Sequence, residues 1–303
     1  MKRHLLSSLV SPRPWTSAAH LLGMAATTAL GLGLGTTAAS AAGLTGATVT
    51  GDYYLYCANA TSTYRGPTCT QSVGQIVGGS ASSPTGNVEL GARTEVAAVG
   101  FTSQAQLSGT IGGQSITLSS LTLADWMGDA DGNGKNLAQE WISALVTHYA
   151  ANLGSTYTSA TGQNNLYNML RASSNTGLRR FSDPNIAYVS QEGATVKVGL
   201  AGHLDARTLF AGTPLASLPV PLQVSELVKV TYGGNTFFKY GFLATNSGLV
   251  NNAGVGADGI SHKGNYEVSF TAVPEPSLML GTLGALALAK GLKGQRRKTH
   301  GEG

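Results

Sequence analysis

Between residues 43 and 272, the alternation of apolar and polar positions divides the chain into a strand-like, a helical and a second strand-like stretch. Before residue 122, short runs of Val, Thr and Ser separated by Gly and Pro predict strands at 47–56, 87–101 and 115–123. From residue 186 onward, similar runs predict strands at 186–191, 194–202 and 265–273. A hairpin over 227–245 is predicted to turn at Gly233, Gly234 and Asn235.

The stretch between these strands has helical periodicity. Leu137, Trp141, Leu145 and Tyr149 recur every four residues, which predicts a helix over 137–153 with one apolar face. A shorter helix is predicted over 165–172. Strands, then helices, then strands predict one α+β domain over 43–272, in which a largely antiparallel β-sheet has a central helical segment packed on it.

The first 42 residues have the pattern of a secretory signal peptide. Basic residues at positions 2, 3 and 13 precede an apolar, uncharged run over 21–35. Small residues between Ala39 and Ala42 then offer a cleavage site for signal peptidase. The sequence therefore predicts that residues 1–42 direct export and are removed.

Residues 273–303 combine three features in order. Pro274, Glu275 and Pro276 come first, and the prolines interrupt the preceding strand because they lack a backbone N–H donor. An apolar run over 277–289 follows, shorter than the roughly 20 residues of a comfortable membrane span. A basic cluster over 290–298 favours retention on the cytoplasmic side of a membrane.

This tripartite tail resembles the PEP-CTERM sorting signal of Gram-negative bacteria that make exopolysaccharide. The resemblance implies that the membrane protease exosortase recognises Pro274, Glu275 and Pro276, and that the C-terminal sorting helix anchors the chain transiently in the inner membrane. It implies a final location at the cell surface or in the extracellular matrix, with exopolysaccharide as a partner. Four stretches of the body are similar to a mainly cyanobacterial subgroup without an established activity: RFSDPNIAYV, VGLAGHLDA, SELVKVTYGG and SHKGNYEV.

The distribution of charge changes the set of expected partners. The whole chain of 303 residues has a formal net charge of +4, which by itself would favour an acidic partner. Between residues 43 and 273, however, 11 Lys and Arg stand against 13 Asp and Glu, a net charge of −2. Because a nucleic-acid binder carries its basic residues on the folded domain, nucleic acid is not a predicted partner.

Cys57 and Cys69 are the two cysteines of the sequence. In an oxidising compartment outside the cytoplasm, we expect them to form a disulfide that closes a polar loop. A catalytic thiol is the less favoured alternative, because a reactive cysteine needs a nearby base and no histidine lies between His20 and His148.

Residues 129–140 (DADGNGKNLAQE) match the calcium-binding loop of an EF-hand, whose oxygen ligands suit a hard cation. The ligand positions are taken by Asp129, Asp131, Asn133, the Lys135 carbonyl and Glu140. Three features weaken the match: Asn136 stands at position 8, where an aliphatic residue is usual, Leu137 stands at the position that binds water, and the sequence contains no second loop. The favoured alternative is a turn in which Asn136 and Gln139 form a capping box. Both interpretations stay open.

Other chemistry-bearing residues do not form a catalytic motif. His148, His203 and His262 lie far apart in the body, and a Ser-His-Asp site would have to bring His203 together with Asp205 and Ser261 in space.

Aromatic rings, which stack on apolar sugar faces, are a better indication of glycan contact. Eight gather near the cysteines and in the hairpin, and we expect half or more to be buried: Tyr53, Tyr54, Tyr56, Tyr64, Phe237, Phe238, Tyr240 and Phe242.

Together, these patterns predict an exported, non-catalytic protein of the cell surface or extracellular matrix, processed by exosortase and associated with exopolysaccharide. Calcium is the one candidate cofactor. The alternative function is a secreted hydrolase that acts on matrix polymer, which the same setting would favour.

Overall fold

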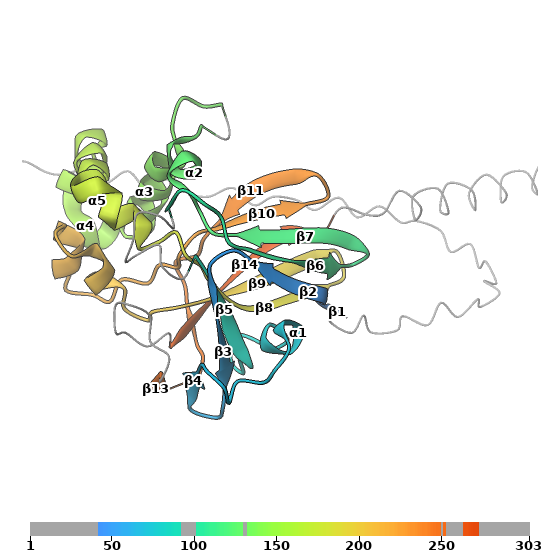
Figure 1. Ribbon diagram of the computed structural model, residues 1–303. Coiled ribbons are helices and arrows are strands. Elements are labelled where there is room, and N and C mark those ends of the chain that lie inside the picture. The colour runs from blue at the N-terminus through green and yellow to red at the C-terminus, as the bar shows by residue number, and fades with distance from the viewer. Residues whose placement is uncertain (1–41, 92–100, 130–131, 250, 253–262, 273–303) are drawn as a thin grey trace, which may run out of the picture. The chain divides into compact units, whose positions relative to one another are not determined.

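A computed structural model describes residues 42–91, 101–129, 132–249, 251–252 and 263–272. The predicted signal peptide, the Pro274–Pro276 motif and the sorting helix lie outside the described residues. The described residues contain mostly antiparallel β-sheets and a group of helices, so the fold class α+β is confirmed (Figure 1).

The first sheet has nine strands within the described residues, in the order β12-β14-β9-β8-β5-β3-β4-β13, with β1 paired to β8. Its pairings are antiparallel except for the short parallel pair of β4 with β13. Its strands are β1 (Ala42–Gly43), β3 (Tyr53–Ala58), β4 (Ser62–Tyr64), β5 (Gly86–Leu90), β8 (Asn185–Glu192), β9 (Thr195–Gly202), β12 (Thr245–Asn246), β13 (Asn251–Asn252) and β14 (Gly264–Thr271).

The second sheet has five antiparallel strands within the described residues, in the order β11-β10-β7-β6-β2. Its strands are β2 (Thr45–Thr50), β6 (Gln106–Ile111), β7 (Gln114–Ser119), β10 (Val228–Tyr232) and β11 (Asn235–Lys239). The predicted hairpin is confirmed: Gly233 and Gly234, at φ +55° and +81°, form the two-residue turn between β10 and β11.

One hydrophobic core is shared by the two sheets. On β10, Val228, Val230 and Tyr232 are buried, whereas Lys229 and Thr231 alternate with them at intermediate exposure, as the period of a strand requires. The opposite wall comes from the first sheet, where Val196, Val198 and Leu200 of β9 join Tyr266 and Val268 of β14 in the same cluster. The domain therefore contains two sheets packed together rather than the single sheet expected.

Two strand predictions are wrong in their boundaries. Residues 47–56 are divided between β2 and β3, which belong to different sheets. Gly51 makes this change of direction at φ +87°, where an added Cβ would lie 2.8 Å from the Ala105 Cα. Strand β7 ends at Ser119 instead of residue 123, because Thr122 caps the next helix. Of the predicted strand over 87–101, residues 92–100 lie outside the described part.

The helical segment forms a second core of its own. Its members are α2 (Leu123–Met127), α3 (Leu137–His148), α4 (Ala150–Thr158), α5 (Ala160–Arg179) and two 3-10 helices, η2 (Arg207–Phe210) and η3 (Pro214–Ser217), whereas the short α1 (Val73–Ile76) lies in the first core. The apolar face of α3 packs against residues of α2, α5 and the 206–227 segment. The expectation that the helices pack on the sheet is therefore corrected: they bury their apolar faces mainly against one another.

The long helix predicted over 137–153 is also shorter than expected. It ends at His148, where the Tyr149 backbone turns out of the α-helical region at φ −99° and ψ 18°. The Tyr149 hydroxyl donates to the Gln223 carbonyl at 2.9 Å and accepts from the Gln223 N–H. These bonds to a distant segment hold Tyr149 in place. A local sequence pattern cannot predict them, because the partner lies far along the chain. The shorter predicted helix over 165–172 lies inside α5.

A buried aromatic cluster fixes α3 within the helical core. The Trp141 ring lies 5.5 Å from Trp126, 4.8 Å from Phe181 and 6.2 Å from Phe210, measured between ring centroids. The Trp126 indole N–H donates to the Ser182 hydroxyl at 2.7 Å, which satisfies its one polar group. The cluster therefore joins α2, α3, the segment after α5, and η2.

An ion pair connects the helical core to the second sheet. The Lys229 ammonium on β10 lies 2.7 Å from the Asp125 carboxylate on α2, and the Asp125 side chain is only 10% exposed. Burial by itself raises the pKa of Asp125, but hydrogen bonds from Lys229 and Thr122 outweigh it, so the pKa lies below its ordinary value of 3.8.

We predict that Lys229→Met lowers the free energy of unfolding at neutral pH by about 2 kcal/mol, because it leaves a largely buried carboxylate without its cation. Since the folded-state pKa is depressed, this contribution is present above pH 3.8 and is lost as the pH falls through the lower folded-state value. Urea unfolding of both proteins between pH 7 and pH 2 measures the difference.

Lys239→Met is the matched control, because Lys239 on the neighbouring strand has no carboxylate partner among the described residues. It should change the unfolding free energy much less. A loss for Lys229→Met that is the same at every pH would contradict the assignment to the ion pair.

Candidate functional site

The predicted disulfide between Cys57 and Cys69 is confirmed. Cys57 lies at the buried end of β3, and Cys69 lies in the loop after β4 and packs against the same core. The bridge therefore fixes the polar loop between the two cysteines to the first sheet. Beside it, the Arg65 guanidinium lies 4.2 Å from the centre of the Tyr54 ring.

In the 129–140 loop, the capping box is confirmed. The Asn136 side chain accepts from the Gln139 N–H at 3.0 Å, and the Gln139 side chain accepts from the Asn136 N–H at 3.1 Å. The Asn136 amide also donates to the Tyr167 hydroxyl at 3.0 Å, which ties the start of α3 to α5. These contacts position the first turn of α3.

Four of the residues predicted as calcium ligands share hydrogen bonds within the loop. Asp129 accepts from the N–H groups of Asn133 and Gly134 at 3.1 and 2.8 Å, and the Asn133 amide donates to Glu140. Lys135 donates its N–H to Asn133. Asp131 lies outside the described residues, and within the described ranges no three His, Cys, Asp or Glu side chains gather where they could hold a metal ion. Calcium binding by this loop stays a prediction.

Two residues of the alternative Ser-His-Asp site, His203 and Asp205, fall within the described residues. His203 is buried, and its carbonyl accepts from the Tyr266 hydroxyl. Both Asp205 oxygens accept from Arg207, at 2.6 to 3.0 Å, and these bonds hold the pKa of Asp205 below its ordinary value. Asp205 also accepts from the Leu222 N–H, so its carboxylate fastens the 205–222 segment. Ser261 and His262 lie outside the described residues.

The aromatic residues are more exposed than expected. Of the eight, Tyr56 is buried, Tyr53 is 38% exposed, and the other six lie between these limits. The expectation that half or more would be buried is therefore wrong. Phe237 and Phe238 are partly exposed because β11 is an edge strand of the second sheet, where neighbouring elements cover side chains incompletely.

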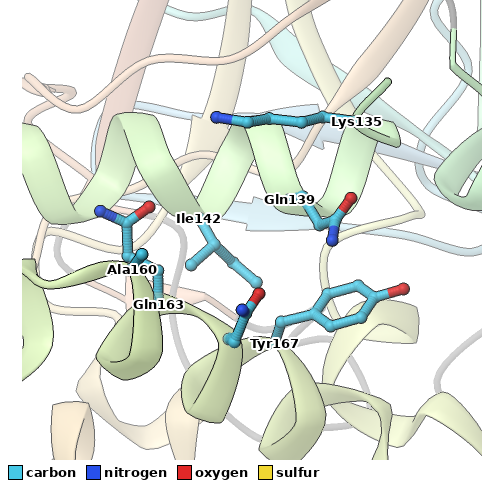
Figure 2. A pocket seen from close by; sticks show the side chains of 7 residues that line it. Lys135, Gln139, Ile142, Ala160, Gln163 and Tyr167 are labelled. Atoms are coloured by element: carbon cyan, nitrogen blue, oxygen red, sulfur yellow. The ribbon is translucent and has the colours of Figure 1, made fainter. Parts of the chain in front are cut away.

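A small pocket of about 180 Å³ lies between α3 and α5. Figure 2 shows Gln139 and Ile142 facing Ala160, Gln163 and Tyr167, with the Lys135 side chain extended along α3. Three carboxamides, from Gln139, Gln163 and Asn164, line the pocket, and no carboxylate lines it. Its volume is below the roughly 300 to 1,000 Å³ of sites for drug-sized ligands, so it fits about one ring.

A larger open groove of about 650 Å³ lies along another face of α3. One wall is the exposed side of the helix, and the other is the segment after β11, which supplies Tyr240 and Phe242. The residues that line it are Asn133, Lys135, Glu140, Ser143, Ala144, Thr147, His148, Tyr240 and Phe242. Four of them, Asn133, Lys135, Tyr240 and Phe242, lie outside the helices and strands.

Sequence reasoning identified part of this groove. It singled out Asn133, Lys135 and Glu140 as calcium ligands, and Tyr240 and Phe242 as glycan-contact candidates. His148 is the last residue of α3 and is exposed. Ser143 and Thr147 were missed, although their spacing of four residues beside the apolar stripe marks a polar face.

Comparisons with protein-family models, curated proteins and solved structures find no match. Among the helices that the structure describes, none is both long and apolar enough to cross a membrane.

We predict that Asn136→Ala lowers the free energy of unfolding by about 1 kcal/mol, because it removes the cap of α3 and the bond to Tyr167. Asn164→Ala is the matched control, since the Asn164 side chain on α5 has no hydrogen-bond partner among the described residues.

Thermal melts with calcium and with chelator test whether the 129–140 loop binds the ion. Calcium binding requires a calcium-induced rise in Tm that Asp129→Ala and Glu140→Ala abolish. Identical melts would leave the loop as a capped turn.

We predict that the double variant Cys57→Ala and Cys69→Ala loses about 3 kcal/mol of stability, from the chain entropy of closing a loop with a sequence separation of 12. Guanidinium unfolding with and without reductant measures the loss. Reductant should lower the stability of the natural protein to that of the variant and leave the variant unchanged. A natural protein that is insensitive to reductant while unfolding would contradict the prediction.

Proposed function

We propose that this chain is an exported, non-catalytic protein of the cell surface or extracellular matrix that associates with exopolysaccharide. Signal peptidase removes residues 1–42, and exosortase processes the chain at Pro274, Glu275 and Pro276. The sorting helix holds the chain in the inner membrane until this step. The body over 43–272 then remains outside the cytoplasm.

The observation that carries this proposal is the disulfide between the two cysteines of the chain. Structural disulfides persist in oxidising compartments outside the cytoplasm and are rare within it. The body that contains this bridge is flanked in the sequence by the two sorting segments, so covalent chemistry and sequence motifs support the same location.

The association with polysaccharide is supported by the groove beside α3. An open surface that combines half-buried aromatic rings with hydroxyl, amide and charged groups suits a ligand with both apolar C–H faces and hydroxyl groups. Sugars have this dual character.

The second candidate function is a secreted hydrolase acting on matrix polymer. It would need catalytic groups that converge on such a surface, and the Asp205 carboxylate is instead engaged by Arg207.

We predict that Pro274→Ala, Glu275→Gln and Pro276→Ala combined in one chain cause the unprocessed protein to accumulate in the membrane fraction of an exosortase-containing host. The natural chain should be recovered from the surface or matrix fraction with a smaller mass, because cleavage at the tail releases it. Fractionation followed by mass spectrometry of the intact protein measures both outcomes.

Glu302→Gln is the matched control, because it removes one carboxylate from the same tail outside the motif. It should leave processing unchanged. If the triple variant is processed and located like the natural chain, the sorting proposal fails. Hydrolysis of a glycan, ester or peptide by the purified protein that is lost in His203→Ala would favour the hydrolase instead.

A further inference from the structure

We infer that the groove between α3 and residues 240–242, hereafter the α3 groove, binds an extended chain of neutral pyranose sugars. This inference deepens the proposed association with polysaccharide, on which it rests. It assigns the contact to one surface and one class of ligand, and it involves no bond-making or bond-breaking step.

The end of α3 and the 240–242 wall of the α3 groove are both hydrogen-bonded to a third segment, residues 223–225. Tyr149, directly after α3, exchanges two hydrogen bonds with the Gln223 backbone. The Ser225 N–H donates to the Gly241 carbonyl, and the Gly241 N–H donates to the Ser225 hydroxyl, each at 2.9 Å. Residues 223–225 therefore fix the 240–242 segment opposite α3, and a preformed site loses less entropy when a ligand binds.

Aromatic rings form one side of this groove. The His148 ring is stacked on Phe242, with centroids 5.1 Å apart and ring planes 28° apart, and Tyr240 lies 5.5 Å from Phe242. His148 is exposed, and Tyr240 and Phe242 are half-buried, so each ring is anchored and still accessible. The ring faces that this stacking leaves uncovered offer apolar area to the C–H face of a pyranose.

The exposed face of α3 supplies polar groups along the same direction. Ser143 presents a hydroxyl group, and Glu140 presents a carboxylate at the first turn. The Thr147 hydroxyl donates to the Ser143 carbonyl at 2.7 Å, so its oxygen is the group that can accept from a sugar. With a rise of about 1.5 Å per residue, the row from Glu140 to His148 is about 12 Å long. Such a row can hydrogen-bond hydroxyl groups on more than one sugar ring, which a compact ligand does not require.

The size and charge of the α3 groove select among sugar ligands. Its volume of about 650 Å³ exceeds the 180 Å³ of the pocket between α3 and α5, which fits a single ring. Its charged lining groups are one ammonium, from Lys135, and one carboxylate, from Glu140, so the described lining has little net charge. Since a polyanion needs a basic surface, an uncharged sugar chain is the better ligand.

Isothermal titration of the purified protein tests this inference with cellohexaose and dextran as neutral probes, alginate as an acidic probe and polyethylene glycol as a polymer without sugar rings. We expect at least one neutral probe to bind more tightly than alginate, and polyethylene glycol not to bind. His148→Ala should weaken binding about tenfold by removing one ring of the stack. Thr147→Trp should abolish it by filling the groove.

His148 and Thr147 are both exposed, so their substitution should not disturb the core. Phe242→Leu adds a variant that keeps the apolar packing but removes the ring. Leu243→Ala is the matched control: Leu243 is 75% exposed and adjacent to Phe242 but does not line the groove. It should bind like the natural protein. Circular dichroism melts establish that each variant is folded.

Several outcomes would overturn the inference: no binding to either neutral probe, tighter binding to alginate, or undiminished binding by Thr147→Trp. The sorting proposal is tested separately, by fractionation of cells. A protein that is processed and held in the matrix but binds sugar equally well in every groove variant keeps the proposed function and loses this site. If the α3 groove binds sugar but the chain is not processed, this site is kept and the sorting proposal is lost.

Discussion

The contact of Trp141 with Trp126, Phe181 and Phe210 is the constraint on which the helical half of the domain depends. These rings come from four separate parts of the chain, and each is buried within the same cluster. Large aromatic side chains bury more area than any other residues and prefer defined ring geometries, so they fix orientation as well as contact. Because Trp141 lies on the inner face of α3, the cluster determines which residues of that helix face outward.

The remaining contacts position this helical core relative to the strands. The ion pair of Asp125 with Lys229 connects α2 to β10 at a site that is largely shielded from water. The 223–225 segment connects the end of α3 to residues 240–242 through hydrogen bonds between side-chain hydroxyls and backbone groups and one backbone–backbone bond, whose geometry is more restrictive than that of apolar contacts. The aromatic cluster, the ion pair and these hydrogen bonds together position the groove, which is lined by residues of α3, of the loop before it and of the segment after β11.

This arrangement separates the tasks of the two halves of the domain. The two sheets share one core and carry the disulfide, so they contain the covalent cross-link that restricts unfolding of the chain. The helical half has a second core and carries on its surface both the α3 groove and the small pocket beside α5. A polymer bound in the groove would contact this half without disturbing the shared core of the sheets.

Local sequence patterns determined the strands β8, β9 and β14, the hairpin turn at Gly233 and Gly234, the cap at Asn136 and the disulfide, because each depends on residues close together or on a single possible pairing. The end of α3 at His148 and the division into two sheets were decided by tertiary contacts. Tyr149 meets Gln223, which is 74 positions away, and β2 and β3 join different sheets although two residues separate them. Periodicity describes which face of an element is apolar, but the partner of that face depends on long-range packing. The α3 groove therefore emerged only when Tyr240 and Phe242 were placed opposite the helix.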